Sequence, residues 1–229
     1  KNNLEKISNS LREEQKKYDL LLGGGDTTFS NKLSFTITSI GYSKKIIYRN
    51  QSNVNNDIYV TGNLGDSFIG LQILKNKIKL SKSKTKYFIN KYYMPDIQNK
   101  FSKNLLSLAT SSMDISDGLI TDLNKLINKQ NVSYKIYEKF IPVSRNLNNL
   151  INIKNLKKID IVSNGDDYQI LFTAKPKNAR IINKCSKSLG VKISKIGTIL
   201  SGKNKSLILD QKGREIANNA GGYIHQFWS

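Results

Sequence analysis

The spacing of apolar residues along the chain predicts interleaved helices and strands. Apolar residues three and four apart mark one helix face, whereas alternation of apolar and polar residues marks a half-buried strand. Helical spacing is found over residues 3–17, 68–74, 87–93, 96–109, 119–126 and 179–189. Strands are predicted over residues 20–22, 33–38, 58–60, 133–137, 169–174, 191–200 and 207–210. Because the elements interleave without a repeated unit, the predicted fold class is α/β or α+β.

Polar segments between these elements are predicted to be connections. The lysine-rich residues 75–86 and the polar, acidic residues 111–118 are expected to form loops, and residues 51–57 to separate two domains. The first helix has no predicted element before it. We therefore expect residues 1–50 to be the end of a domain whose beginning lies outside this chain, and residues 51–229 to form a C-terminal α+β domain.

The charge of the chain changes this picture little. It has 229 residues with 37 Lys and Arg against 17 Asp and Glu, a formal net charge of +20. A basic surface attracts nucleic acid, but these lysines are scattered through nearly every segment. We therefore favour a compositional bias over a nucleic-acid-binding surface, with a basic nucleic-acid-binding module as the alternative from another functional class.

Other classes are disfavoured by what the sequence lacks. No apolar run reaches the roughly 18–20 residues that span a bilayer, and no signal peptide opens the chain. A soluble, cytoplasmic protein without a membrane partner is therefore expected. The one cysteine excludes an internal disulfide and a multi-cysteine metal site. The one histidine, His225, argues against histidine-based metal binding and a Ser-His-Asp triad.

The scarce aspartates are the candidates for chemistry. They lie beside glycine, serine or threonine at predicted element ends, at Asp26, Asp66, Asp114 with Asp117, and Asp166 with Asp167. An aspartate in such a turn is commonly a helix cap or an Asx turn. We predict a capping role for Asp66, because Ser67 and an apolar helix follow it.

Asp114 and Asp117 suit a metal better than a cap. They lie three residues apart between apolar neighbours, where two unpartnered carboxylates would repel each other and lose hydration. Magnesium would relieve this cost, since it takes oxygen ligands and bridges carboxylates to phosphates. The chain has no Walker or kinase glycine loop, so a nucleotide enzyme of this kind would hold phosphates through metals and backbone amides.

Several segments resemble motifs of the thiamine-monophosphate kinases, which belong to the aminoimidazole ribonucleotide synthetase superfamily. They occur in the family's order at residues 24–28 (GGDTT), 59–67 (YVTGNLGDS), 113–119 (MDISDGL), 165–168 (GDDY), 196–197 (IG) and 222–227 (GYIHQF). The resemblance implies a two-domain aminoimidazole ribonucleotide synthetase-like fold whose first domain is incomplete here. It also implies ATP-dependent, magnesium-assisted phosphorylation of thiamine monophosphate to thiamine diphosphate by direct in-line transfer.

The resemblance also implies roles for individual residues. Metal ligands would be Asp26, Asp114 and Asp117; ATP contacts would be Gly25, Asp26, Arg49 and Ser116; and substrate contacts would be Asp166 and Phe227. No residue is expected to act as an acid, base or nucleophile. Asp166 stands where the family has glutamate, and one extra residue near the end makes Tyr223 or Trp228 an alternative to Phe227.

The family's N-terminal aspartate-rich motifs have no counterpart in this sequence. We therefore expect the chain alone to be inactive and prone to aggregation, and the full-length protein to be a homodimer. The alternative within the superfamily is another ATP-dependent enzyme, a purine-synthesis cyclo-ligase or a hydrogenase-maturation protein.

Overall fold

The computed structural model describes residues 2–202 and 205–216, which fall into two compact units that divide between Tyr42 and Ser43. The first unit begins with helix α1 (Asn2–Tyr18), which confirms the helix predicted over residues 3–17. No helix in the described part of the chain is long and apolar enough to cross a membrane.

The strands predicted over residues 20–22 and 33–38 are wrong, because no strand is formed between residues 19 and 42. The alternating side chains stay in solvent, with exposed fractions of 84% for Leu33, 63% for Phe35 and 77% for Ile37. A strand exists only through hydrogen bonds to a neighbouring strand. Among the described residues, none pairs with this segment.

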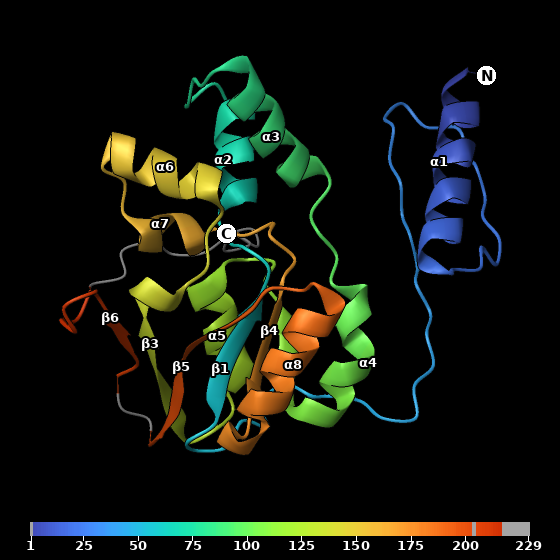
Figure 1. Ribbon diagram of the computed structural model, residues 1–229. Coiled ribbons are helices and arrows are strands. Elements are labelled where there is room, and N and C mark those ends of the chain that lie inside the picture. Colours follow the sequence, from blue (N-terminus) through green and yellow to red (C-terminus); the bar gives the residue numbers. More distant parts are fainter. Residues whose placement is uncertain (1, 203–204, 217–229) are drawn as a thin grey trace, which may run out of the picture. The chain divides into compact units, whose positions relative to one another are not determined.

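The second unit is built on a six-stranded mixed sheet (Figure 1). Its strands are β1 (Asp57–Thr61), β2 (Ala109–Asp114), β3 (Val132–Tyr137), β4 (Ile170–Ala174), β5 (Ile193–Ser201) and β6 (Leu207–Leu209). Their order across the sheet is β2-β4-β1-β5-β3-β6. Each neighbouring pair is antiparallel except β3 with β6. The α/β class is thus confirmed, with strand β1 in the middle of the sheet.

Seven helices of this unit lie on and above the sheet (Figure 1). They are α2 (Asp66–Leu74), α3 (Lys82–Tyr93), α4 (Asn99–Leu108), α5 (Leu119–Ile127), α6 (Arg145–Lys154), α7 (Lys158–Val162) and α8 (Ala179–Leu189). Two 3₁₀ turns, Glu138–Phe140 and Pro176–Asn178, complete the described elements. Helix α8 ends at Gly190 in the left-handed conformation, as predicted.

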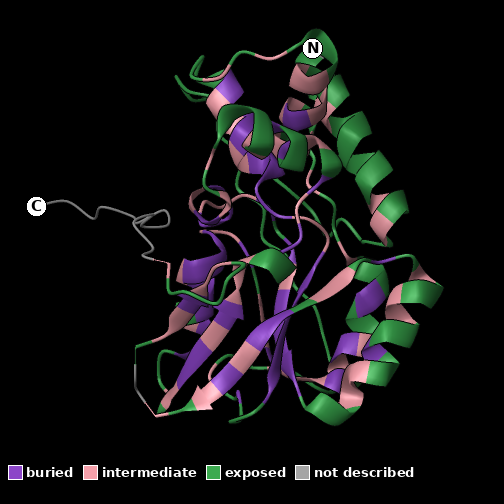
Figure 2. Cartoon of the chain, turned by 60° about the vertical axis from the view of Figure 1, so that its left-hand side comes forward, coloured by how far each residue is buried: buried purple, intermediate pink, exposed green. Residues whose placement is uncertain are grey.

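The two faces of the sheet are covered by different helices, as the alternation of strand side chains requires. Ile58 and Leu171 point to the face covered by α5, whose Leu123 belongs to the same cluster. Tyr59 and Phe172 point to the other face, where their rings stack against α4 and α8. Figure 2 shows the buried residues concentrated in this sheet and on the inner helix faces.

Helices α2, α3 and α6 form a separate apolar cluster beyond one end of the sheet (Figure 1). Phe88 of α3 is fully buried against Ile69 and Leu147. Gly70 permits this packing, because a Cβ atom there would lie 2.3 Å from the carbonyl oxygen of Phe88. The cluster therefore fixes the start of α2 above the strand ends.

Three predicted boundaries differ in the structure. Residues 82–86 are not loop but the first turns of α3, since lysine favours helix when its side chain stays in solvent. Residues 111–114 are not loop but strand β2, whose Ser111 hydroxyl hydrogen-bonds Ser52 and Thr173. Polar strand residues find partners there that are remote in sequence. Helix α4 also begins at Asn99 rather than at residue 96.

Candidate active site

Three loops of the second unit lie together at one end of the strands, because neighbouring strands of the sheet run in opposite directions. Strand β1 ends at Thr61 and runs antiparallel to β4, which starts at Ile170. Strand β2 also runs antiparallel to β4 and ends at Asp114, opposite Ile170. The loops that follow β1 and β2 and the loop that precedes β4 therefore lie together. We call these three loops, residues 62–65, 115–118 and 163–169, the acidic junction.

Backbone hydrogen bonds fasten two of these loops to each other. Asp166 donates its N–H to the Ser116 carbonyl at 2.9 Å, and Tyr168 donates to the Ile115 carbonyl at 2.9 Å. In return Ile115 donates to the Gln169 carbonyl at 2.9 Å. The predicted ATP contact Ser116 and the predicted substrate contact Asp166 are thereby brought next to each other.

Two glycines make this close approach possible. A Cβ atom on Gly118 would lie 2.0 Å from the Ser163 carbonyl oxygen, and the φ of Gly118 is +117°. A Cβ atom on Gly165 would lie 1.8 Å from the Ser116 carbonyl oxygen. Both distances are below any real contact, so the two loops can touch only where these residues lack a side chain.

Asp122 organises the loop after β2, and sequence reasoning missed it. Its side chain has no exposed surface. One of its oxygens, Oδ2, accepts the backbone N–H groups of Ser116 at 2.9 Å, Asp117 at 2.8 Å and Gly118 at 3.2 Å. These donors lie just before the first turn of α5, where the helix dipole also favours a negative charge. The polar position within a helical pattern gave no indication that its side chain was buried.

Lys125 joins Asp122 to the predicted metal ligand Asp117. Its Nζ donates to the Asp117 carboxylate and, at 3.1 Å, to the second oxygen of Asp122. Burial alone would lower the pKa of Lys125, but the hydrogen bonds to Asp117 and Asp122 raise it above its ordinary value. The ammonium group is therefore charged and compensates the two carboxylates.

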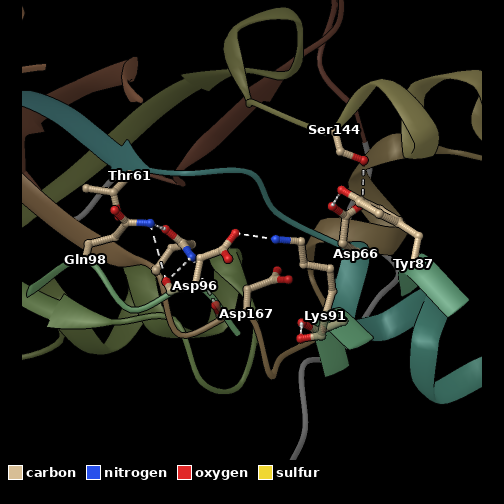
Figure 3. A network of polar contacts seen from close by, with 10 residues as sticks. Thr61, Asp66, Tyr87, Lys91, Asp96, Gln98, Ser144 and Asp167 are labelled. Carbon is tan, nitrogen blue, oxygen red and sulfur yellow. Dashed lines mark hydrogen bonds and ion pairs between the residues drawn. The ribbon is translucent and has the colours of Figure 1, made fainter. Parts of the chain in front are cut away.

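Asp66 is buried and does not cap helix α2, which corrects the predicted role. The helix is preceded by Gly65 in the left-handed conformation, without a side-chain cap. The carboxylate instead accepts hydrogen bonds from Ser144 at 2.7 Å and Tyr87 at 2.8 Å, which tie α2 to α6 and α3 (Figure 3). Burial raises the pKa of Asp66, although both hydroxyl groups oppose this shift.

Asp167 links the loop before β4 to the start of α2. It is 3% exposed, and its Oδ2 accepts the N–H of Gly65 at 2.7 Å. Burial raises the pKa of Asp167 to about 8, the hydrogen bond from Gly65 lowers it, and neighbouring Asp66 raises it again. Asp167 is thus a buried carboxyl group whose proton is favoured by burial, while the side chain of the adjacent Asp166 is partly exposed.

A polar network continues from Asp167 to residues 96–98 (Figure 3). Gln169 accepts from Thr61 at 3.1 Å and from Gln98 at 3.1 Å, and donates to the Asp96 carbonyl at 2.9 Å. Lys91 forms an ion pair with the Asp96 carboxylate at 2.5 Å. A small cavity is lined by Asn63, Asp66, Ser67, Lys91, Pro95, Asp96, Asp167 and Gln169.

The structure thus brings four of the predicted site residues together at the acidic junction. Asp114 ends β2 with an exposed side chain, and Ser116, Asp117 and Asp166 follow within the two fastened loops. Gly25 and Asp26 belong to the first unit, where both are exposed and Asp26 accepts the N–H of Thr27 at 2.7 Å.

Among the described residues, Arg49 is not found at this junction. Arg49 precedes Asn50, whose N–H bonds the Leu126 carbonyl at 2.8 Å. Leu126 is in the last turn of α5, whereas Ser116 precedes the first turn, so about 10 Å of helix separates the two positions. Phe227 and its alternatives Tyr223 and Trp228 lie outside the described residues.

The donor set is suited to magnesium only with help from a ligand. The described residues contain no group of three or more Asp, Glu, His or Cys side chains that could hold a metal by themselves. Asp114 and Asp117 offer hard oxygen donors, and magnesium is commonly held by one or two carboxylates together with phosphate oxygens and water. The junction therefore fits a magnesium–polyphosphate complex better than a free ion.

The same geometry bears on the expectation that backbone amides hold phosphates. The sequence predicts metals and backbone amides as phosphate ligands, but the amides of residues 116–118 already point at Asp122. An incoming phosphate would have to displace a buried carboxylate to reach them. At this loop, phosphate recognition is therefore left to side chains and bound cations.

Comparison with known proteins identifies relatives of the chain. A family model, "AIR synthase related protein, C-terminal domain", matches residues 53–210. The thiamine-monophosphate kinase of Buchnera aphidicola subsp. Schizaphis graminum is 33% identical over 225 residues, which are 97% of this chain and 69% of that protein. The thiamine-monophosphate kinase of Escherichia coli K12 is 30% identical over 225 residues, 97% of this chain and 68% of that protein.

A solved structure shows the same fold. AaThiL, solved in complex with AMPPCP and TMP, aligns with a TM-score of 0.65 at 23% identity, over 80% of this chain and 55% of that chain. The present chain therefore spans about two thirds of these curated relatives, 69% and 68%, and a little over half of the solved chain.

Proposed function

The chain belongs to the thiamine-monophosphate kinase family, and we propose that it acts in the ATP-dependent phosphorylation of thiamine monophosphate to thiamine diphosphate. The observation that carries this proposal is the acidic junction, where Asp114, Ser116, Asp117 and Asp166 are brought together by three loops at one sheet edge. AaThiL, which shares the fold, was solved with AMPPCP and TMP.

The residue chemistry of the junction suits direct transfer between two phosphates. The acceptor is itself a phosphate, whose second pKa near 6 leaves it largely ionised at neutral pH. No side chain is needed as a general base. The obstacle is repulsion between anionic acceptor and anionic donor, so the site must supply positive charge and hold both groups in line.

We assign Asp114 and Asp117 as the ligands that would hold magnesium at this site. Bound there with ATP, magnesium would neutralise phosphate oxygens and orient them. Ser116 would donate its hydroxyl to the nucleotide, and this role is supported by its backbone, which is held by Asp122 on one side and Asp166 on the other. Asp166 would face the second substrate, with a reach one methylene shorter than the glutamate of the family.

The remaining assignments stay proposals from the resemblance. Gly25, Asp26 and Arg49 would contact ATP, Asp26 would add a metal ligand, and Phe227 would lie at the thiamine end. The same resemblance proposes a cytoplasmic homodimer for the complete enzyme.

Ligand binding to the whole chain tests this function. Isothermal titration calorimetry with AMPPCP, MgCl₂ and thiamine monophosphate should give magnesium-dependent nucleotide binding. Asp117→Asn and Asp114→Asn should each weaken it about tenfold or more, because each removes a charged oxygen ligand. Asp210→Asn is the matched control, since Asp210 pairs with Arg214 after β6, the outermost strand on the side of the sheet away from β2. Equal binding by all four proteins would contradict the assignment.

A further inference from the structure

The loop before α5, residues 115–118, is held by the buried carboxylate of Asp122, a group that phosphoryl transfer itself does not require. Three successive N–H groups, from residues 116–118, converge on one oxygen of Asp122 at 2.8–3.2 Å. A fully buried carboxylate is costly unless its oxygens are satisfied. Here one oxygen takes the three amides, and the other takes the ammonium group of Lys125 at 3.1 Å.

Lys125 connects this buried carboxylate to the surface of the site. Its side chain is 35% exposed, and the Asp117 carboxylate that it also contacts is 21% exposed. The lysine lies one turn after Asp122 in α5, at the i,i+3 spacing that places side chains on one helix face. The ammonium group therefore occupies a position between a buried acid and an acid that solvent can reach.

We propose that Asp122 positions the loop that carries the metal ligand Asp117, and that Lys125 competes with a cation for the Asp117 carboxylate. Asp122 fixes the backbone of residues 116–118, so that the Ser116 and Asp117 side chains project from a rigid loop. The ammonium group of Lys125 contacts the Asp117 carboxylate, for which a divalent cation would compete, and its contact with Asp122 would not depend on that cation. The assignment of Asp117 to the cation rests on the proposed function.

This arrangement makes a prediction about affinity that a merely structural lysine would not. While Lys125 holds Asp117, a cation must compete with a positive charge at hydrogen-bond distance. Lys125→Met removes that charge and keeps most of the apolar stem, so Asp117 becomes a stronger ligand. Mn²⁺ titration of the whole chain, followed by electron paramagnetic resonance with and without AMPPCP, should give binding about five- to tenfold tighter than in wild type.

Two further variants isolate the charge. Lys125→Arg keeps a cation over Asp117 and should restore wild-type Mn²⁺ affinity. Lys195→Met removes a lysine of the same kind from a buried aspartate, Asp57, at the far end of β1, and should leave Mn²⁺ affinity unchanged. Unchanged or weaker Mn²⁺ binding in Lys125→Met, or no Mn²⁺ binding to wild type in either condition, would overturn the proposal.

The role of Asp122 has a separate readout. In Asp122→Asn an NH2 group replaces one carboxylate oxygen and faces either the three loop amides or the Lys125 ammonium group, so the three N–H groups lose a charged acceptor. Hydrogen exchange of the amides of residues 116–118 should accelerate at least tenfold in this variant and stay slow in Lys125→Met. Slow exchange in folded Asp122→Asn would contradict its positioning role, and the lysine variants test the proposal if Asp122→Asn does not fold.

The outcomes also separate this inference from the proposed function. Tighter Mn²⁺ binding by Lys125→Met without any AMPPCP or thiamine monophosphate binding would support the roles of Asp122 and Lys125 and contradict the proposed kinase function. Normal binding of AMPPCP and thiamine monophosphate, with an Mn²⁺ affinity that does not change in Lys125→Met, would support the kinase function and contradict the role of Lys125.

Discussion

At the scale of single residues, the candidate aspartates differ by burial rather than by sequence context. Asp166 and Asp167 are adjacent, yet Asp167 is buried against the start of α2 and Asp166 remains at the loop surface. The sequence could place both in a turn beside glycine, but it could not rank them. That ranking depends on Gly65, which lies 102 positions away along the chain.

Asp167 gives the stability of the protein a defined pH dependence. Its pKa is about 8 in the fold and 3.8 in the unfolded chain, so the folded state binds the extra proton. Its contribution is fully present below pH 3.8 and is lost as pH rises through 8. Raising pH from 6 to 9 should therefore lower the free energy of unfolding by an amount on the order of one to a few kcal/mol, since each pKa unit corresponds to about 1.4 kcal/mol.

Urea unfolding of wild type and Asp167→Asn at both pH values measures this effect. The asparagine cannot ionise, so most of the loss between pH 6 and pH 9 should disappear. Asp57→Asn removes a buried aspartate at the other end of β1 and should retain the wild-type pH dependence. A wild-type stability that rises between pH 6 and 9, or a dependence that Asp167→Asn leaves intact, would rule out this account.

At the scale of elements, periodicity predicted those helices and strands whose apolar face is buried by the fold. Helix α5 is an example, because Leu119, Leu123 and Leu126 are all fully buried as the spacing predicted. Strand β2 was missed because its serines and threonines are satisfied by residues distant in sequence. The reverse error occurred over residues 33–38, where the alternation is present but no described strand pairs with it.

The junction itself could be predicted only in part. The acidic and glycine-rich motifs identified Asp114, Ser116, Asp117 and Asp166, and the fold brings these four together. Asp122 could not be predicted in the same way. An acid within an amphipathic helix reads as a solvent-facing position, and only the turn of residues 116–118 back over α5 gives it three amide donors.

The contact between the two loops predicts an element-level requirement for Gly165. Gly165→Ala places a Cβ atom 1.8 Å from the Ser116 carbonyl oxygen, so the loops must separate. We expect a loss of about 1–3 kcal/mol in the free energy of unfolding, typical of overpacking, together with weaker AMPPCP binding. Gly41→Ala is the control, because no atom lies within 4 Å of its Cβ position. Wild-type stability and binding in Gly165→Ala would refute the close contact.

At the scale of the whole molecule, an excess of positive charge contrasts with an acidic junction at one sheet edge. The net charge is +20, yet Asp66, Asp96, Asp114, Asp117, Asp166 and Asp167 all lie on or beside the three loops. A basic protein surface attracts polyanions in general, whereas a cluster of carboxylates attracts a polyanion only through cations. The arrangement favours magnesium-bound nucleotide over nucleic acid as the ligand of the acidic junction.

The central claim is that the acidic junction binds a divalent cation together with the nucleotide. The most direct test is the anomalous difference map of crystals of the chain grown with Mn²⁺, AMPPCP and thiamine monophosphate. We predict a manganese peak within ligand distance of Asp114 or Asp117, adjacent to nucleotide phosphate oxygens. Nucleotide bound elsewhere on the chain, or a junction without manganese beside bound nucleotide, would contradict the account.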